Sequence, residues 1–261
     1  MRRWDLIPDG EAIITSTSRL LPVRSAGVPA MLKVADDPEE RFGAGLMVWW
    51  NGEGAARVLA HGEDALLLER ATGKVSLTEM VGDGFDDDAT RIICRVAAEL
   101  HGLKERPRPE RVSLSRWFEA LEPAAAKQGG IFRHAAATAE KLLANPRDVV
   151  VLHGDLHHGN VLDFGERGWL AIDPKRLLGE RTFDFVNLLR NPSPQVALAS
   201  GRFGRQVAVI SQAACLDRTR LLEWTLAFTC LSASWILADG EQPELDLAVA
   251  DLAARALAGG T

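Results

Sequence analysis

The chain has 261 residues, of which 47% are hydrophobic and 25% are charged, a composition that predicts an ordinary globular protein of one or two domains. Acidic residues outnumber basic ones by 36 to 30, so a nucleic-acid partner has no electrostatic support. The amino-terminal segment lacks the apolar core of a signal peptide. We therefore expect a cytoplasmic protein with buried, free thiols at its three cysteines, and with no membrane or protein partner.

The first 72 residues are predicted to form a small β-rich lobe. Pro38 and the two glutamates after it begin a helix that we expect to run to Trp50. Gly27 and Pro29 mark a turn between two of the strands. The strands are predicted from short β-prone runs at Ala12–Thr15, Arg19–Val23, Ala30–Val34, Val58–Leu59 and Ala65–Leu68.

Helical spacing of apolar residues dominates residues 73–261, which we predict to form a larger second domain. Lys175–Thr182 is interpreted as a polar loop, and Phe183–Arg190 as a helix ended by Asn191 and Pro192. The run Leu221–Ala238 is about one membrane thickness long, but charged and hydroxyl residues interrupt it, so we expect a buried helix. Longer helices are predicted at Asp88–Leu103, Leu114–Gln128, Ile131–Asn145, Gly204–Asp217, Arg218–Ala238 and Pro243–Ala258.

Residues 149–174 read VVVLHGDLHHGNVLDFGERGWLAIDP and contain the candidate catalytic and metal-binding residues. Two apolar runs, Val149–Leu152 and Trp169–Ile172, indicate short strands that present Asp155, Asn160 and Asp173 at adjacent ends. A kinase needs an Asp that holds the attacking hydroxyl, with an Asn and a second Asp that hold Mg²⁺ on the ATP phosphates. The pattern therefore predicts Asp155 as the catalytic residue, and Asn160 and Asp173 as metal ligands.

The spacing D-L-x-x-x-N from Asp155 to Asn160 is that of the protein-kinase catalytic loop, with Gly154 in place of the usual arginine. A kinase also needs a lysine that binds the α- and β-phosphates. Lys33 lies between apolar residues of a predicted strand, and periodicity alone would place it facing solvent. Beside this constellation, Lys33 is the expected phosphate-binding lysine.

The combination of HGDxxxxN at 153–160 with IDP at 172–174 resembles the aminoglycoside phosphotransferases of the kinase-like superfamily. The segment IDPKRLLGERTFDFVNLLRNP is most similar to the aminoglycoside/hydroxyurea resistance kinases, whose best-known members are streptomycin 6-phosphotransferases. The stretches LLPVRSAGVPAMLKVA, GEGAARVLA and LLLERA extend the resemblance over most of the chain.

This resemblance implies an α+β, two-lobe protein-kinase-like fold, with a small antiparallel β lobe that binds nucleotide and a larger, mainly helical lobe. ATP and Mg²⁺ would lie in the cleft between the lobes. The implied reaction is ATP-dependent phosphorylation of a hydroxyl on a polyhydroxylated, cationic small molecule, and the resemblance points to the 6-hydroxyl of streptomycin. Streptomycin carries guanidinium groups, so carboxylates are expected around it, with Glu180, Glu223, Asp239 and Glu241 as candidates.

The resemblance also implies nucleotide-binding positions in and near the small lobe. Glu69 and Ala71 belong to the hinge, whose backbone groups are expected to bind adenine. Ser18 ends the segment at the position of the nucleotide-covering loop, although an ordinary polar turn explains this segment equally well. Lys175 follows Asp173 where the family has a basic residue, and it is expected to offset phosphate charge.

A glutamate on the helix after Lys33 is expected to hold the lysine ammonium in place. We assign Glu40 to this role, and Glu39 is an almost equal alternative. In many relatives this glutamate falls about a turn later, near Gly43. Asp184 resembles the family's structural aspartate that braces the catalytic loop, and His153 is expected to support the backbone of that loop.

Three alternatives stay open at this point. The acceptor of the kinase can be hydroxyurea or another small alcohol. The chain can instead be a catalytically silent nucleotide-binding protein, which the doubtful helix glutamate would favour. The cluster His153, His157 and His158 also allows a metallophosphoesterase, which would need further metal ligands elsewhere.

Overall fold

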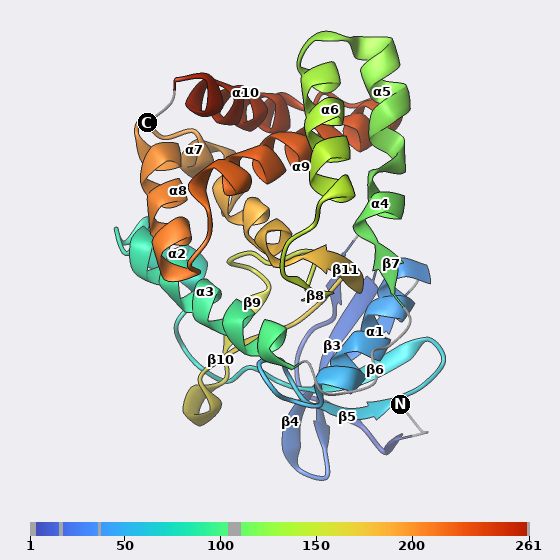
Figure 1. Ribbon diagram of the computed structural model, residues 1–261. Helices are drawn as coiled ribbons and strands as arrows, with labels where there is room; N and C mark the ends of the chain where they lie inside the picture. The colour runs from blue at the N-terminus through green and yellow to red at the C-terminus, as the bar shows by residue number, and fades with distance from the viewer. Residues whose placement is uncertain (1–3, 16–17, 36–37, 104–110, 260–261) are drawn as a thin grey trace.

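The computed structural model describes residues 4–15, 18–35, 38–103 and 111–259, and the side chains of residues 35 and 38–42 lie outside the described part. Figure 1 shows two lobes, a sheet with one helix at the bottom of the view and a larger helical lobe above it. The predicted division after residue 72 falls in the segment between the last strand of the sheet, which ends at Glu69, and the next helix, which begins at Leu77.

The small lobe is an antiparallel sheet of strand order β1-β3-β4-β6-β5, with β2 paired to β3. The β3–β4 hairpin turns at Ala26 and Gly27, which both have positive φ, as a two-residue hairpin requires. The predicted strands and the helix α1 (Pro38–Trp50) are confirmed. The strand bounds are β1 (Ile7–Pro8), β2 (Ile13–Ile14), β3 (Ser18–Ser25), β4 (Val28–Ala35), β5 (Val58–His61) and β6 (Ala65–Glu69).

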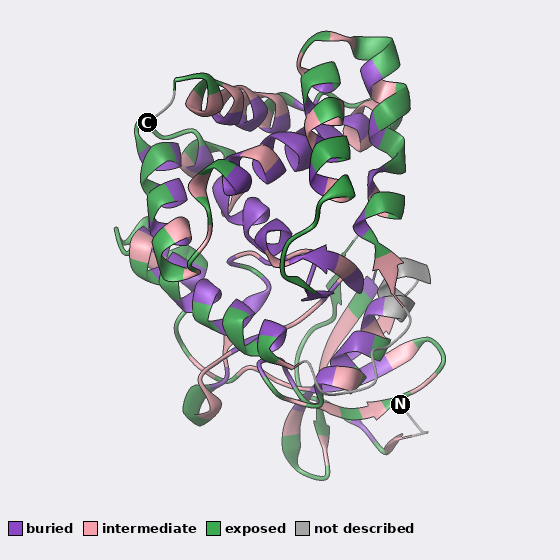
Figure 2. Ribbon diagram, in the orientation of Figure 1, coloured by how far each residue is buried: buried purple, intermediate pink, exposed green. Residues whose placement is uncertain are grey.

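The large lobe consists mainly of helices packed around the central helix α9, as the buried residues in Figure 2 show. Its longer helices are α3 (Asp86–Gly102), α5 (Leu121–Gln128), α6 (Gly130–Ala144), α8 (Arg202–Ala213), α9 (Arg218–Ala238) and α10 (Glu244–Ala258). The shorter ones are α2 (Leu77–Gly82), α4 (Leu114–Trp117) and α7 (Pro194–Ala197), with 3-10 segments η2 (Phe118–Ala120), η3 (Gly165–Arg167) and η4 (Arg181–Arg190).

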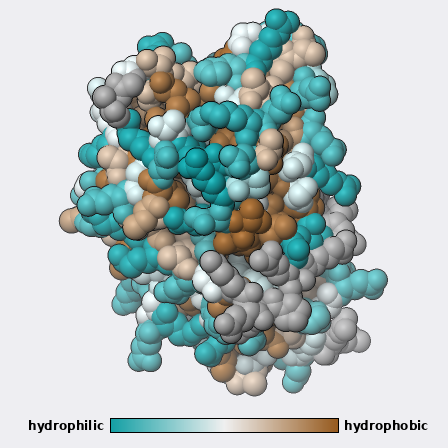
Figure 3. Space-filling model, in the orientation of Figure 1, coloured by the Kyte–Doolittle hydropathy of each residue, from teal (hydrophilic) through white to brown (hydrophobic). Residues whose placement is uncertain are grey.

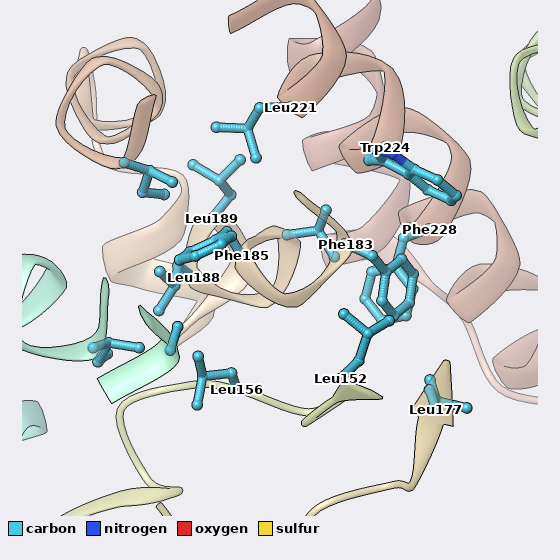
Figure 4. Packing of buried hydrophobic residues seen from close by; sticks show 14 of the residues in the cluster. Leu152, Leu156, Leu177, Phe183, Phe185, Leu188, Leu189, Leu221, Trp224 and Phe228 are labelled. Carbon is cyan, nitrogen blue, oxygen red and sulfur yellow. The ribbon is translucent and has the colours of Figure 1, made fainter. Parts of the chain in front are cut away.

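The core of the large lobe is aromatic where α9 meets η4. The ring of Phe183 packs edge-to-face on Trp224 at 5.7 Å and on Phe228 at 5.3 Å between centroids, a favourable geometry for aromatic pairs. Figure 4 shows these rings beside Leu152 and Leu177, which come from two strands below them. This core therefore packs directly against the strand that leads into the predicted catalytic loop.

Helix α9 is the one helix within the described ranges that is long and apolar enough to cross a membrane, and 72% of its most apolar stretch is buried. It packs against α6, α10 and η4, so its burial is that of a core helix, as the sequence predicted.

The face of the molecule in Figure 3 is mainly hydrophilic, with smaller hydrophobic areas.

Five short strands lie in the large lobe, and one of them corrects a prediction. Leu177–Glu180, predicted as part of a polar loop, is the strand β11, which lies between β7 and β8. The two apolar runs around the catalytic loop are strands, but they belong to different sheets, because β8 pairs with β11 and β10 pairs with β9. The remaining bounds are β7 (Val112–Ser113), β8 (Val149–Leu152), β9 (Val161–Asp163) and β10 (Trp169–Ala171).

Polar residues on both sides of the apolar pair Leu177 and Leu178 hid β11 in the sequence. Gly179 is required within this strand, because a Cβ there would lie 2.3 Å from the Leu114 side chain. The expectation of three buried thiols was also wrong in part, since Cys94 and Cys230 are buried but Cys215 is exposed.

Glu180, at the end of β11, was a candidate for the acceptor pocket, but the structure uses it to hold the large lobe together. Its side chain is 1% exposed, and both oxygens accept hydrogen bonds from Arg220 at 2.6 Å. It also accepts the backbone N–H of Arg147 at 3.0 Å. Burial alone raises the pKa of Glu180, but these hydrogen bonds outweigh it and hold the pKa below its ordinary value.

Replacing Glu180 by alanine is expected to lower the free energy of unfolding by about 3–5 kcal/mol, because Arg220 is left buried without its counter-charge. Urea denaturation measures this loss. Because the pKa of Glu180 is lower in the folded chain, its contribution is complete above the unfolded value of about 4.3 and is lost as the pH falls through the folded pKa.

Lys141→Ala is the matched control, because the Lys141–Glu223 pair has an exposed lysine. Its removal is expected to change the free energy of unfolding by less than about 1 kcal/mol. Equal losses in Glu180→Ala and Lys141→Ala would show that the Glu180–Arg220 pair does not stabilise the lobe.

Candidate active site

A cavity of about 370 Å³ lies between the two lobes. Apolar side chains from the sheet, from α1 and from the large lobe form most of its wall: Leu20, Met31, Met47, Leu68, Leu162, Phe164 and Ile172. The predicted hinge residues Glu69 and Ala71 and the charged pair Lys33 and Asp173 also line it. A largely apolar cavity with a few polar groups is typical of a small-molecule site.

Lys33 and Asp173 were predicted from distant parts of the chain, and the structure brings them together. The ammonium of Lys33, on β4, donates a hydrogen bond to Asp173 Oδ1, which comes from the large lobe. Lys33 is 8% exposed, so the lysine does not face solvent as periodicity alone suggested. The pair places one positive charge and one oxygen ligand on the same wall of the cavity.

The helix glutamate predicted as the partner of Lys33 lies outside the described part of the structure. Glu40 and Glu39 belong to the first turn of α1, where the side chains are not described. At Gly43, near which the resemblance would place this glutamate, a Cβ would lie 2.3 Å from the carbonyl oxygen of Pro174. A glutamate therefore does not fit at this position, because α1 packs its backbone directly against the residue after Asp173.

Asp155 follows β8 and is held by two amide side chains. Asn187, on η4, donates to Asp155 Oδ1 at 2.9 Å. Asn160 donates to the backbone oxygen of Asp155 at 2.8 Å and approaches Oδ2 at 3.4 Å. The predicted catalytic residue and the first predicted metal ligand are thus in direct contact. This contact uses the amide nitrogen of Asn160 and not its amide oxygen.

His153 joins the catalytic loop to the segment that carries Asp173. Its Nδ1 accepts the N–H of Asp155 at 3.3 Å, and its Nε2 lies 2.8 Å from the carbonyl oxygen of Ile172. Burial lowers the pKa of His153, although Asp184 and Asp155 oppose this effect. Together the bonds select the neutral tautomer with its proton on Nε2, and the predicted support by His153 is confirmed.

Two further contacts complete this junction. The backbone N–H of Lys175 donates to the carbonyl oxygen of His153 at 2.7 Å. The ring of Trp50, at the end of α1, stacks on His153 at 6.0 Å with 20° between the planes. Asp155 and Asp173 therefore keep a fixed relation through one buried imidazole rather than through a shared sheet.

Asp184 braces the catalytic loop, as the resemblance implied. Its carboxylate accepts the N–H of His153 at 2.9 Å and the N–H of Gly154 at 2.7 Å, and His101 Nε2 lies 2.7 Å from it. Gly154 has φ 81°, and a Cβ there would lie 2.9 Å from Leu177. This close packing explains why a glycine replaces the arginine of protein kinases at this position.

The remaining predicted nucleotide-binding residues have other contacts in the described structure. The carboxylate of Glu69 pairs with Arg167 and accepts the N–H of Arg57 at 2.6 Å, so its side chain joins the hinge to the large lobe. The hydroxyl of Thr15 accepts the N–H of Ser18 at 3.0 Å, which is the contact of a polar turn. Ser16 and Thr17 lie outside the described residues, and the phosphate-binding roles of Ser18 and Lys175 stay predictions.

The histidines of the loop do not form a metal centre. In residues 4–15, 18–35, 38–103 and 111–259, no three His, Cys, Asp or Glu side chains converge in a way that could hold a metal ion. His158 is buried, and burial lowers its pKa to about 4. The described structure therefore offers no support for the metallophosphoesterase alternative.

Asn187, His101 and Trp50 are site residues that sequence reasoning missed. Each lies on a helix, where one Asn, His or Trp among many apolar residues carries no visible chemical signal. Their roles depend on tertiary contacts with the loop 153–160. Spacing along the chain therefore did not predict them.

Gly43→Ala is expected to weaken ATP binding about tenfold or more, because the new methyl group would push α1 away from Pro174 and displace Asp173. Calorimetric titration with a non-hydrolysable ATP analogue measures the affinity.

Gly45→Ala is the matched control, because a Cβ at this exposed position of the same helix meets nothing within 4 Å. It is expected to stabilise the chain by roughly 0.5–1 kcal/mol with unchanged affinity. Wild-type affinity in Gly43→Ala would contradict the assigned role of this close contact.

Comparison with known proteins identifies the family. The family model of the aminoglycoside/hydroxyurea antibiotic resistance kinases matches residues 3–240. The chain is 47% identical to a streptomycin 3''-kinase from Klebsiella pneumoniae, over 99% of this chain and 98% of that protein. It is 32% identical to a streptomycin 6-kinase from Streptomyces griseus, over 91% of this chain and 81% of that protein.

A solved choline/ethanolamine kinase family protein from Mesorhizobium loti has the same fold, with a TM-score of 0.67 over 95% of this chain and 86% of that chain, at 18% identity. The predicted two-lobe kinase-like fold is thereby confirmed. The chain belongs to the aminoglycoside/hydroxyurea antibiotic resistance kinase family and is a phosphotransferase of the aminoglycoside phosphotransferase type.

Proposed function

We propose that this chain transfers the γ-phosphate of ATP to a hydroxyl of streptomycin and so inactivates the antibiotic. The observation that carries the proposal is the identity of 47% to a streptomycin 3''-kinase over almost the whole of both chains. The site supports it, because Lys33 contacts Asp173 and Asn160 contacts Asp155, and these are the residue types that a kinase uses.

The 3''-hydroxyl is favoured over the 6-hydroxyl that the sequence resemblance suggested. The 3''-kinase relative is 47% identical, whereas the 6-kinase from Streptomyces griseus is 32% identical. We therefore propose 3''-O-phosphorylation first and keep the 6-hydroxyl as the second candidate. A two-dimensional ¹H–³¹P NMR spectrum of the product distinguishes them, because the phosphate couples to the proton on the carbon that it esterifies.

In the proposed reaction, Asp155 accepts a hydrogen bond from the substrate hydroxyl and directs its oxygen toward the γ-phosphorus. The new O–P bond forms as the bond to the β-phosphate oxygen breaks, ADP leaves, and the hydroxyl proton passes to Asp155 and then to solvent. Positioning supplies most of the rate, so the carboxylate does not need to be a strong base. The side-chain amides of Asn187 and Asn160, one on each oxygen, keep the carboxylate in one orientation.

The residues present fit a bound Mg²⁺–ATP complex. Asn160 and Asp173 offer the amide and carboxylate oxygens that Mg²⁺ prefers, and the side chain of Asp173 is 41% exposed toward the cavity that it lines. The metal would neutralise charge on the phosphates when it is bound. Lys33, released from Asp173, would bind the α- and β-phosphates. We also propose a cytoplasmic location, because the reaction uses ATP.

The alternative acceptors are hydroxyurea, which the family description names, and other small alcohols. A silent nucleotide-binding role has less support, because the described site retains all four of its expected polar residues, as the pairs Lys33–Asp173 and Asn160–Asp155. ADP release with a panel of acceptors separates these possibilities. Release with streptomycin and not with hydroxyurea supports the proposal, and release with hydroxyurea alone would overturn it.

Asp155→Ala is expected to lower kcat with streptomycin about 10³-fold or more, because the hydroxyl loses the group that orients it, while ATP affinity stays close to that of the wild type. Asp173→Ala is expected to lower both kcat and the affinity for Mg²⁺–ATP. Coupled ADP release and nucleotide titration measure the two effects. Near-normal activity in Asp155→Ala would show that another group holds the acceptor.

A further inference from the structure

The segment η4 (Arg181–Arg190) is a 3-10 helix of 10 residues, in a class of helix that seldom exceeds three or four. A 3-10 helix has three residues per turn, so side chains three positions apart are eclipsed along one edge. In an α-helix, each such step would rotate the side chain by about 60° around the axis. Asp184, Asn187 and Arg190 therefore form a straight polar edge, which we call the η4 edge.

The η4 edge contacts consecutive residues of the catalytic loop. Asp184 accepts the backbone N–H groups of His153 and Gly154. One turn later, Asn187 donates to the carboxylate of Asp155 at 2.9 Å. Two residues of the edge thus bind three consecutive loop residues in register.

The third member of the edge anchors it to the helical lobe. Arg190 donates to Ser232 on α9 at 2.7 Å and to Asp246 on α10 at 2.6 Å. Its guanidinium lies 5.7 Å from the ring centroid of Phe228. Figure 4 shows apolar side chains of the same segment, among them Phe183 and Leu188, packed between α9 and the strand and loop below. Arg190 therefore anchors one end of the η4 edge to the helical lobe, and Asn187 contacts Asp155 one turn away from this anchor.

The carboxylate of Asp155 has one amide donor on each oxygen. Oδ1 accepts from Asn187 at 2.9 Å, and Oδ2 lies 3.4 Å from the amide nitrogen of Asn160. His157 Nε2 is 3.9 Å from Oδ1, too far for a hydrogen bond. Asn187 is 7% exposed, so water does not readily replace it. It makes the shorter of the two amide contacts to the carboxylate and is not a predicted metal ligand.

We propose that Asn187 is a positioning residue for phosphoryl transfer, which sets the orientation of the Asp155 carboxylate toward the acceptor hydroxyl. The 3-10 form of η4 aligns the brace at Asp184 and the donor at Asn187 along one edge, and both act on the same loop. The proposal rests on the kinase chemistry of the family and does not depend on which acceptor the chain uses.

Three variants test it. Asn187→Leu removes the donor at similar volume, Asn187→Asp places a second carboxylate against Asp155, and Asn187→Gln retains a donor. We expect kcat to fall about 10- to 100-fold in Asn187→Leu, further in Asn187→Asp, and least in Asn187→Gln, with the KM for ATP unchanged. ADP release measures kcat and KM, and thermal unfolding measures stability.

Gln206→Leu is the control for the loss of a buried amide. Gln206 is 1% exposed on α8. Its side chain bonds to Thr90 and Asp87 on α3 and not to the catalytic loop. It is expected to lower Tm without lowering kcat. If Asn187→Leu likewise lowers Tm but leaves kcat within about twofold of the wild type, Asn187 has only a structural role and the proposal fails.

The slow transfer of phosphate from ATP to water is measured in the same samples. If the wild type releases no ADP with streptomycin, the proposed function fails on its own. The Asn187 variants are then compared with the acceptor that does support turnover, or with water, since Asp155 would orient either nucleophile. The expected order of rates is the same in each case, and its absence would overturn the positioning role.

Discussion

The buried imidazole of His153 is the group on which the rest of the site depends. One nitrogen accepts from the backbone of Asp155 and the other is bonded to the carbonyl oxygen of Ile172, next to Asp173. The bond that Nδ1 accepts requires the neutral ring, and burial favours this form because a charged imidazole would lose its hydration. The predicted catalytic residue Asp155 and the predicted metal ligand Asp173 are thus held together by side-chain chemistry, although their strands lie in different sheets.

The second constraint is the connection between the lobes, which the nucleotide must bridge. Residues 54–56 pair with β10, through Ala171 N to Gly54 O at 3.0 Å and Ala56 N to Ala171 O at 2.9 Å. Glu69 and Arg167 join the hinge to the hairpin of β9 and β10. The ion pair of Lys33 and Asp173 spans the cavity itself. These contacts give the small lobe a defined position over the large one and so fix the walls of the cavity between them.

Much of the fold and the centre of the site could be predicted from the sequence, because they depend on local patterns. The helix α9 was predicted with its observed bounds, and Asp155, Asn160 and Asp173 carry the spacing that kinase chemistry requires. Lys33 became recognisable only beside that motif. These residues share a property: their chemistry is visible without knowledge of what packs against them.

The misses share the opposite property. The strand β11 has two leucines and a glycine between polar residues, and its pairing with β8 and β7 is a tertiary fact. Glu180 was predicted as a candidate for the acceptor pocket, but in the structure it pairs with the buried Arg220. The role of Asn187 depends on its contact with Asp155, which comes from a distant segment of the chain. Hydrogen bonds between distant segments decide each of these cases.

The most direct test of this account is a crystal structure of the chain with Mg²⁺, a non-hydrolysable ATP analogue and streptomycin. The account predicts the acceptor hydroxyl within about 3.2 Å of the Asp155 carboxylate, with Lys33 moved from Asp173 to the phosphates. A hydroxyl held by another residue, with Asp155 turned away from the γ-phosphate, would contradict it.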